Sequence, residues 1–195
     1  MKFEHKELST TTGLKIKGPI LIKPKVFEDE RGFFFESWNQ KNWKEILNEY
    51  NQKPQQFVQD NHSKSSKGVL RGLHFQKSPF PQGKLIRCIS GEIYDVAVDI
   101  RKDSCTFGKW VATYLNSLEH NQFWIPEGFA HGFLTISRSA EVNYKTTNFW
   151  KKNCEECLFW EDKTIAIDWP INEFKIENLL ISGKDREGKT LNEVS

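Results

Sequence analysis

Residues 92–101 read EIYDVAVDIR, and apolar side chains recur in this stretch with a period of two. One face would carry Tyr94, Val96, Val98 and Ile100. The other face would carry Ile93, Asp95, Ala97 and Asp99. Alternation of this kind predicts a β-strand, because successive side chains of a strand point to opposite sides of the sheet.

The same alternation appears in many short stretches along the chain, separated by Gly or by Asn, Asp and Ser groups. These stretches are FFFES, FVQDN, GVLRGLHF, KLIRCI, KWVATYL, QFWIP, GFLTI and EVNYKTT. One helix is predicted, over Asn39–Tyr50, where Trp43, Ile46, Leu47 and Tyr50 have helical spacing and Asn39 can cap the first turn. Many short strands and few helices predict a mostly β fold, an antiparallel sandwich or jelly roll.

Length and composition favour one globular domain over residues 1–195, with a polar lead-in at 1–17 and a polar tail at 186–195. The net charge of +2 gives no reason to expect nucleic acid or a membrane as partner. The N-terminal residues lack the apolar segment of a signal peptide, and no stretch has the roughly 20 apolar residues of a membrane span. We therefore expect a cytoplasmic protein whose four cysteines are reduced.

The stretch GVLRGLHFQ, residues 68–76, is largely apolar but contains Arg71 and His74. Burying such side chains is unfavourable unless they find hydrogen-bonding or charged partners. Their spacing of three places them on opposite faces of a regular strand. Gly72 lies between them, and a bulge there would let both side chains address one cavity.

Two motifs raise the question of a metal. The segment WIPEGFAHGF has the P-x-G-x-x-H pattern of the second cupin motif, ending in His131. The first cupin motif normally supplies an H-x-H pair, but only His74 is present, so no metal site is expected. Cys154 and Cys157 form C-E-E-C without a second such pair, and we interpret that spacing as incidental.

Nine stretches in order resemble one family, the dTDP-4-dehydrorhamnose 3,5-epimerases of the cupin superfamily. They are FEDERGFFFESWN, FVQDNHSKS, GVLRGLHFQ, QGKLIRC, DVAVDIRKDS, TFGKW, WIPEGFAHGF, NYKTTN and ISGKD, and they cover residues 18–186. The resemblance implies a cupin-type jelly-roll double-sheet barrel, a homodimer, and no metal or organic cofactor. It also implies cofactor-independent conversion of dTDP-4-dehydro-6-deoxy-D-glucose to dTDP-4-dehydro-L-rhamnose, in dTDP-L-rhamnose biosynthesis.

The resemblance assigns four residues to the chemistry. His74 would remove protons beside the C4 ketone, and Asp185 would orient it. Tyr144 would donate a proton on the opposite face of the sugar, since a phenol keeps its proton at neutral pH. Lys84 would stabilise the enolate.

Substrate-binding roles are implied at further matching positions. These are Arg31, Glu36, Gln59, Asn61, Arg71, His131, Trp150, Glu155 and Lys184. Arg31 and Glu36 would reach the site from the neighbouring subunit. The family commonly has tyrosines where this chain has Phe149 and Trp150, and we expect Trp150 to stack on the thymine ring.

Three alternatives remain open on the sequence. A mono-epimerase or ketoisomerase acting on a related dTDP-4-keto-6-deoxyhexose would share the fold and the base. A metal-dependent cupin oxygenase is disfavoured by the missing H-x-H pair. A non-catalytic sugar-nucleotide binder would be expected to lack His74 or Tyr144.

Overall fold

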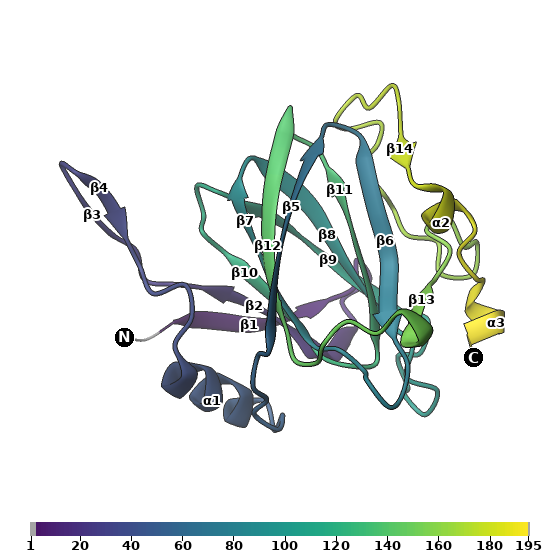
Figure 1. The fold of residues 1–195 in the computed structure, drawn as a ribbon, viewed down its shortest axis with the longest axis horizontal. Coiled ribbons are helices and arrows are strands. Elements are labelled where there is room, and N and C mark those ends of the chain that lie inside the picture. Colours follow the sequence, from purple (N-terminus) through teal and green to yellow (C-terminus); the bar gives the residue numbers. More distant parts are fainter. Residues whose placement is uncertain (1–2, 195) are drawn as a thin grey trace.

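A computed structural model describes residues 3–194, which form two antiparallel sheets that face each other (Figure 1). The first sheet has the order β1 (Glu4–Ser9), β2 (Lys15–Lys23), β10 (Gln122–Ile125), β7 (Lys84–Ser90), β12 (Ser139–Thr146), β5 (Gln59–Ser66). The second has the order β13 (Glu155–Cys157), β6 (Val69–Gln76), β11 (Phe129–Thr135), β8 (Glu92–Asp99), β9 (Trp110–Asn116), and β14 (Leu180–Ile181) pairs with β6 in parallel. This is the expected cupin-type jelly roll.

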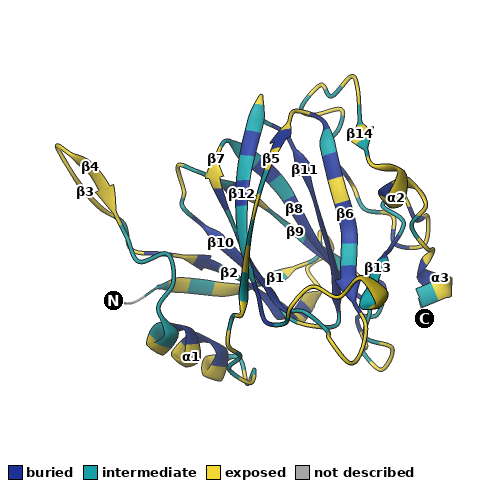
Figure 2. Cartoon of the chain, in the orientation of Figure 1, coloured by how far each residue is buried: buried dark blue, intermediate teal, exposed yellow. Residues whose placement is uncertain are grey.

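The two faces of β8 pack on different cores, which confirms the alternation in EIYDVAVDIR. Ile93 and Ala97 are fully buried in the cluster between the sheets, together with Phe123 of β10. Val96 and Val98 point the other way, into a cluster with the C-terminal segment. Figure 2 shows the burial of the strands that run through the centre of the barrel.

The predicted helix is present as α1 (Gln40–Glu49), and the Asn39 side chain accepts hydrogen bonds from the backbone at its first turn. Trp43, Ile46 and Leu47 are buried against the outer face of the first sheet. Among the helices of residues 3–194, none is long and apolar enough to cross a bilayer.

Within residues 3–194, the first and last segments are more structured than the sequence suggested. The expected lead-in instead supplies β1 and the start of β2, which pair with each other, and Ile16 is fully buried. In the expected polar tail, Leu191 of α3 (Leu191–Val194) is buried in the outer cluster on the second sheet. Both segments are predominantly polar in composition, so buried apolar residues such as Ile16 and Leu191 did not stand out in the sequence.

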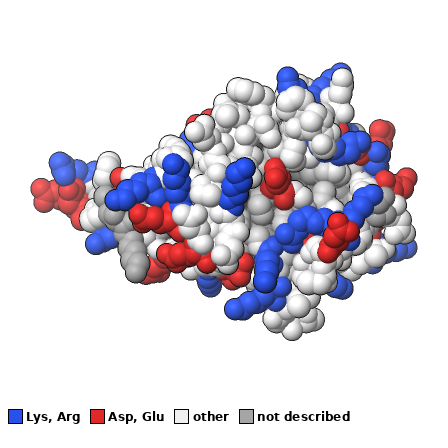
Figure 3. Space-filling model, turned by 90° about the horizontal axis from the view of Figure 1, so that it is seen from below, with Lys and Arg blue, Asp and Glu red and all other residues white. Residues whose placement is uncertain are grey.

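The stretch FFFES only partly forms a strand. β3 (Phe27–Asp29) and β4 (Gly32–Phe34) form a hairpin that projects from the barrel (Figure 1). Phe33 and Phe34 are 60% and 68% exposed on it. On the face of the molecule in Figure 3, basic and acidic side chains are interspersed, in keeping with the small net charge.

The expected irregularity at Gly72 is present in β6. Across the β6–β11 pair, His74 lies opposite His131 and Arg71 lies opposite Phe133, so three steps on β6 match two on β11. Gly72 has a φ of +115°. The extra residue lets Arg71 and His74 both escape burial, which a regular strand would not allow.

We expect Gly72→Ala to destabilise the fold strongly. A Cβ at this position would lie 2.5 Å from Gly132 Cα and 2.6 Å from the His131 carbonyl oxygen. Backbone strain and overpacking together should reduce the free energy of unfolding by on the order of 3 kcal/mol. Denaturant unfolding measures this loss.

Gly32→Ala is the matched control. Gly32 also has a positive φ, +125°, but nothing lies within 4 Å of its Cβ position. Backbone strain alone acts there, so Gly32→Ala should lower the free energy of unfolding by only about 1 kcal/mol. Equal losses in the two variants would contradict a close-packed bulge.

Candidate active site

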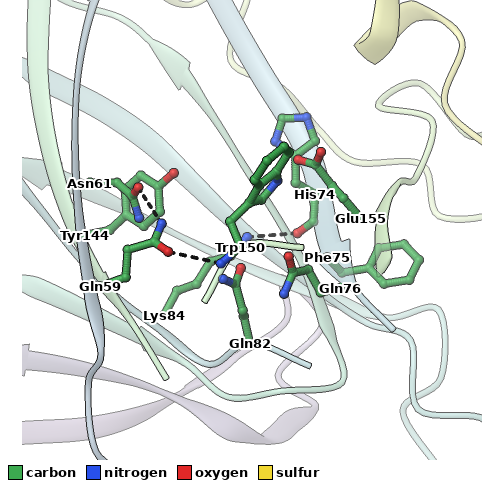
Figure 4. Close-up of a pocket in the computed structure, with 10 residues that line it drawn as sticks. All are labelled: Gln59, Asn61, His74, Phe75, Gln76, Gln82, Lys84, Tyr144, Trp150 and Glu155. Atoms are coloured by element: carbon green, nitrogen blue, oxygen red, sulfur yellow. Dashed lines mark hydrogen bonds between the residues drawn. The ribbon is translucent and has the colours of Figure 1, made fainter. Parts of the chain in front are cut away.

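A pocket of about 90 Å³ opens at one end of the barrel between the two sheets (Figure 4). It is lined by Gln59, Asn61, His74, Phe75, Gln76, Gln82, Lys84, Tyr144, Trp150 and Glu155. All but Phe75, Gln76 and Gln82 were predicted from the sequence as site residues. The fold therefore gathers residues of β5, β6, β7, β12 and the segment after β12 around one space.

His74 and Asp185 meet although they are 111 residues apart. His74 Nε2 lies 2.7 Å from Asp185 Oδ1, and the Gly72 N–H donates to Asp185 Oδ2 at 3.3 Å. Burial by itself raises the pKa of Asp185. The hydrogen bonds from His74 and Gly72 and the charge of His74 outweigh that effect and lower the pKa below its usual value. An ionised carboxylate therefore orients the His74 ring.

A short helix places Asp185 over the bulge. α2 (Gly183–Arg186) is capped by Ser182, whose Oγ accepts a hydrogen bond from the Asp185 N–H at 3.1 Å. Asp185 is 3% exposed, so its carboxylate depends on protein donors rather than on water.

Lys84 lies on the floor of the pocket, and its side chain is buried. Its Nζ donates to the His74 carbonyl oxygen at 3.0 Å. Burial lowers the pKa of Lys84 to about 8, even though the charges of Asp95 and Glu155 oppose the change. The ammonium is thus the main form at neutral pH, in a place where water screens it little.

Tyr144 faces the pocket from the opposite sheet to His74. It belongs to β12, where it pairs with Asn61 of β5 and Ile86 of β7. Burial raises the pKa of the phenol, and the positive charge of Arg71 partly offsets this. A neutral phenol and the His74 imidazole therefore stand on opposite sides of one space.

Two predicted residues, Arg71 and Lys184, lie beside a second cleft that adjoins His74, and Glu155 of the pocket lining is linked to it through Lys184. Arg71 Nε donates to Ser65 Oγ at 3.0 Å, and its side chain borders a second cleft of about 410 Å³ that also reaches His74 and Asp185. Lys184 borders this cleft and pairs with Glu155 at 2.5 Å. Burial alone raises the pKa of Glu155, but the bond and charge of Lys184 lower it below the usual value.

The segment that carries Trp150 has no strand partner and is held by glutamine side chains. Gln76 Nε2 donates to the Phe149 carbonyl at 3.3 Å, and Gln76 Oε1 accepts from the Lys151 N–H at 2.6 Å. The Trp150 N–H donates to Gln59 Oε1 at 3.0 Å, and Gln59 Nε2 donates to Asn61 Oδ1. The half-exposed indole is therefore positioned through its own backbone and through a side-chain hydrogen bond to Glu155.

Gln76 was missed by the sequence analysis. It is 6% exposed and uses both its amide donor and its acceptor. Its position two residues after His74 was the available signal, because residues i and i+2 of a strand share a face.

His131 does not line the pocket. It is buried, and its Nε2 lies 2.9 Å from Oδ1 of the fully buried Asp95. Burial lowers the pKa of His131, and burial raises the pKa of Asp95. The expected contact between His131 and the substrate remains a prediction.

Arg31 and Glu36 also lie outside the pocket of this chain. Arg31 is exposed at the turn of the β3–β4 hairpin, where it pairs with Asp29 at 2.5 Å. Glu36 accepts hydrogen bonds from Asn39 and Asn42. Neither side chain contributes to the site within this chain.

Comparison with known proteins gives the family. The model of the dTDP-4-dehydrorhamnose 3,5-epimerase family matches residues 13–193. The chain belongs to this family of isomerases. It is 54% identical over 175 residues to the dTDP-4-dehydrorhamnose 3,5-epimerase of Shigella flexneri, a match that covers 90% of this chain and 92% of the relative. The Pseudomonas aeruginosa epimerase is 51% identical over 178 residues, covering 91% and 93%.

A solved structure shares the fold. The epimerase of Legionella pneumophila, crystallised in complex with dTDP-4-keto-L-rhamnose, is 43% identical and superposes with a TM-score of 0.87. The match covers 98% of this chain and 95% of that one. The family resemblance seen in the nine sequence stretches is thereby confirmed.

Proposed function

We propose that this protein is a dTDP-4-dehydrorhamnose 3,5-epimerase. It converts dTDP-4-dehydro-6-deoxy-D-glucose to dTDP-4-dehydro-L-rhamnose, on the route to dTDP-L-rhamnose. The observation that carries the proposal is the pairing of His74 with Asp185 on one side of the pocket while Tyr144 faces it from the other sheet. Membership of the epimerase family supports the same substrate.

His74 is the base in this mechanism. The Asp185 carboxylate accepts from Nε2–H, which leaves Nδ1 to remove a proton from the carbon beside the ketone. Asp185 also stabilises the imidazolium that forms. The C4 ketone of the substrate acidifies both C3 and C5, so the same base can serve each position in turn, and we propose that no cofactor is required.

Lys84 and Tyr144 complete each inversion. Proton removal leaves an enolate, and the Lys84 ammonium stabilises the negative oxygen in a site shielded from water. Tyr144 then returns a proton to the face opposite His74. The raised pKa of Tyr144 keeps that proton available at neutral pH.

We expect His74 and Tyr144 to separate proton removal from inversion. The measurement is proton NMR of the substrate with the enzyme in deuterated water. The wild type should exchange hydrogen at both C3 and C5. His74→Ala should abolish exchange and turnover, with a loss of about 10³-fold or more. Tyr144→Phe should reduce inversion far more than exchange, because the base remains.

Other outcomes of this experiment would change the assignment. Exchange at one carbon only in the wild type would indicate a mono-epimerase. Turnover by His74→Ala would exclude His74 as the base, and equal losses of exchange and inversion in Tyr144→Phe would contradict the division of roles.

Lys84 should impose an alkaline limit on turnover. Its pKa is lowered to about 8, so the ammonium is present below that pH and is lost as the pH rises through it. The kcat should therefore fall above pH 8. Lys84→Met should lower kcat by about 10²-fold or more, and the alkaline limb of the pH profile, the decrease in kcat above pH 8, should disappear.

Lys145 offers the matched control for this pH profile. Its ammonium pairs with Asp60 at 2.9 Å, away from the pocket lining. Lys145→Met should keep both the rate and the alkaline limb. A limb that persists in Lys84→Met would show that another group causes it.

Nucleotide binding is assigned to the rim of the pocket. Trp150 is half exposed beside Gln59, where a thymine ring can stack on the indole. Arg71 and Lys184 supply positive charge for the diphosphate from the outer cleft. Gln59 and Asn61 face the sugar from β5.

We further propose a cytoplasmic homodimer with a site shared between subunits. The β3–β4 hairpin projects away from the barrel with exposed phenylalanines, which favours burial against a second copy. Arg31 and Glu36 lie near this hairpin and would enter the neighbour's pocket. The four free cysteines fit a reducing compartment.

Mixed dimers test the shared site. Arg31→Ala and His74→Ala should each be impaired alone. After joint unfolding and refolding, half of the dimers combine both chains, and each has one intact site, which restores about a quarter of wild-type activity. No recovery in verified mixed dimers would contradict contribution of Arg31 across the interface.

A further inference from the structure

The C-E-E-C motif has no role in the mechanism, and the fold separates its two cysteines. Cys154 ends the short helix η1 (Lys152–Cys154) and is half-buried. Cys157 is buried in β13, where it lies directly opposite His74 of β6. The cysteine that faces the catalytic pair is therefore Cys157.

The Cys157 thiol and His74 approach the same carboxylate oxygen. Cys157 Sγ lies 3.9 Å from Asp185 Oδ1, and His74 Nε2 lies 2.7 Å from that oxygen. All three atoms lie within 4.8 Å of one another. Sulfur, imidazole nitrogen and carboxylate oxygen are the three ligand types that zinc prefers in proteins.

The spacing of these atoms suits one tetrahedral ion. Zinc bonds of about 2.3 Å to sulfur and about 2.0–2.2 Å to nitrogen and oxygen separate neighbouring ligand atoms by roughly 3.3–3.6 Å. The distances of 2.7 Å and 3.9 Å to Asp185 Oδ1 lie on either side of that range. The third separation, between Cys157 and His74, is at most 4.8 Å, so shifts of up to about 1 Å bring all three atoms to bonding distance from one ion. A water molecule would complete the fourth position.

We propose that His74, Cys157 and Asp185 form a binding site for a thiophilic divalent cation such as Zn²⁺, and that binding inhibits the enzyme. The inhibition rests on the proposed function. The cation takes the place of the proton on His74 Nε2, and the neutral imidazole then carries its proton on Nδ1, where it can no longer accept one from the substrate. The thiol of Cys157 loses its proton to solvent, and no redox change is involved. With Nε2 bound to metal, His74 can no longer form the imidazolium that Asp185 stabilises.

An ion can reach the trio from outside the substrate pocket. The outer cleft of about 410 Å³ borders both His74 and Asp185. The nearby Lys184 ammonium is paired with Glu155, which reduces its repulsion of a cation. The His74 side chain is 29% exposed, so the approach to its ring is partly open.

Cobalt binding to the full-length, chelator-treated protein tests the site without relying on activity. Co²⁺ bound to a thiolate gives a charge-transfer absorption in the near ultraviolet, and the wild type should show it at one ion per chain. Cys157→Ala should lose this band, and Cys154→Ala should keep it. Persistence in Cys157→Ala, absence in the wild type, or loss in Cys154→Ala would overturn the proposal.

Inhibition by Zn²⁺ provides the second measurement. Cys157→Ala should retain turnover and need about tenfold more Zn²⁺ for half-inhibition, whereas Cys154→Ala should match the wild type. Cys157→Ser serves if the alanine variant does not fold, with the same expectations. Equal sensitivity of wild type and the Cys157 variants to Zn²⁺ would contradict the inhibitory role.

The two measurements keep the proposals apart. A cobalt band in a protein that exchanges no substrate hydrogen would contradict the epimerase assignment alone. Turnover without a cobalt band would contradict the metal site alone.

Discussion

The hydrogen bond between His74 and Asp185 depends on an irregular backbone at Gly72. The bulge brings His74 toward the pocket and leaves the Gly72 N–H free to donate to the same carboxylate. β14 runs parallel to the start of β6, so it delivers Ser182 and α2 directly over that point. A local loss of strand regularity thus creates the contact by which Asp185 orients the His74 ring, as the proposed role of this histidine as a base requires.

Buried charge beneath the pocket is balanced within the barrel. Lys84 is 8% exposed, and an ammonium at such a place is stable only near compensating negative charge. Asp95 and Glu155 provide it, and Asp95 also bonds His131 behind the pocket wall. Asp95 shares a face of β8 with Ile93 and Ala97, so one strand face contributes both to the core and to the charge balance of Lys84.

The sequence predicts most strands because alternation is a local property, whereas the pocket residues were implied by the family resemblance. Gln59 and Asn61, two residues apart on β5, share a strand face and both line the pocket, and Asn39 was found as a helix cap. Asp185 carries no such signal, since its partner is 111 residues distant and only the family resemblance joined them. The segment EHKELS looked like a lead-in because an edge strand half-open to solvent needs few apolar residues.

The segment around Trp150 explains how an aromatic position can change without disturbing the site. Its peptide groups are held by Gln59, Gln76 and Gln82, whose amides take the place of a neighbouring strand. None of these bonds involves the aromatic ring. A tryptophan can therefore stand where the family commonly has a tyrosine, since the backbone sets the position of the ring. The indole also hydrogen-bonds Glu155, which helps to lower the pKa of that carboxyl.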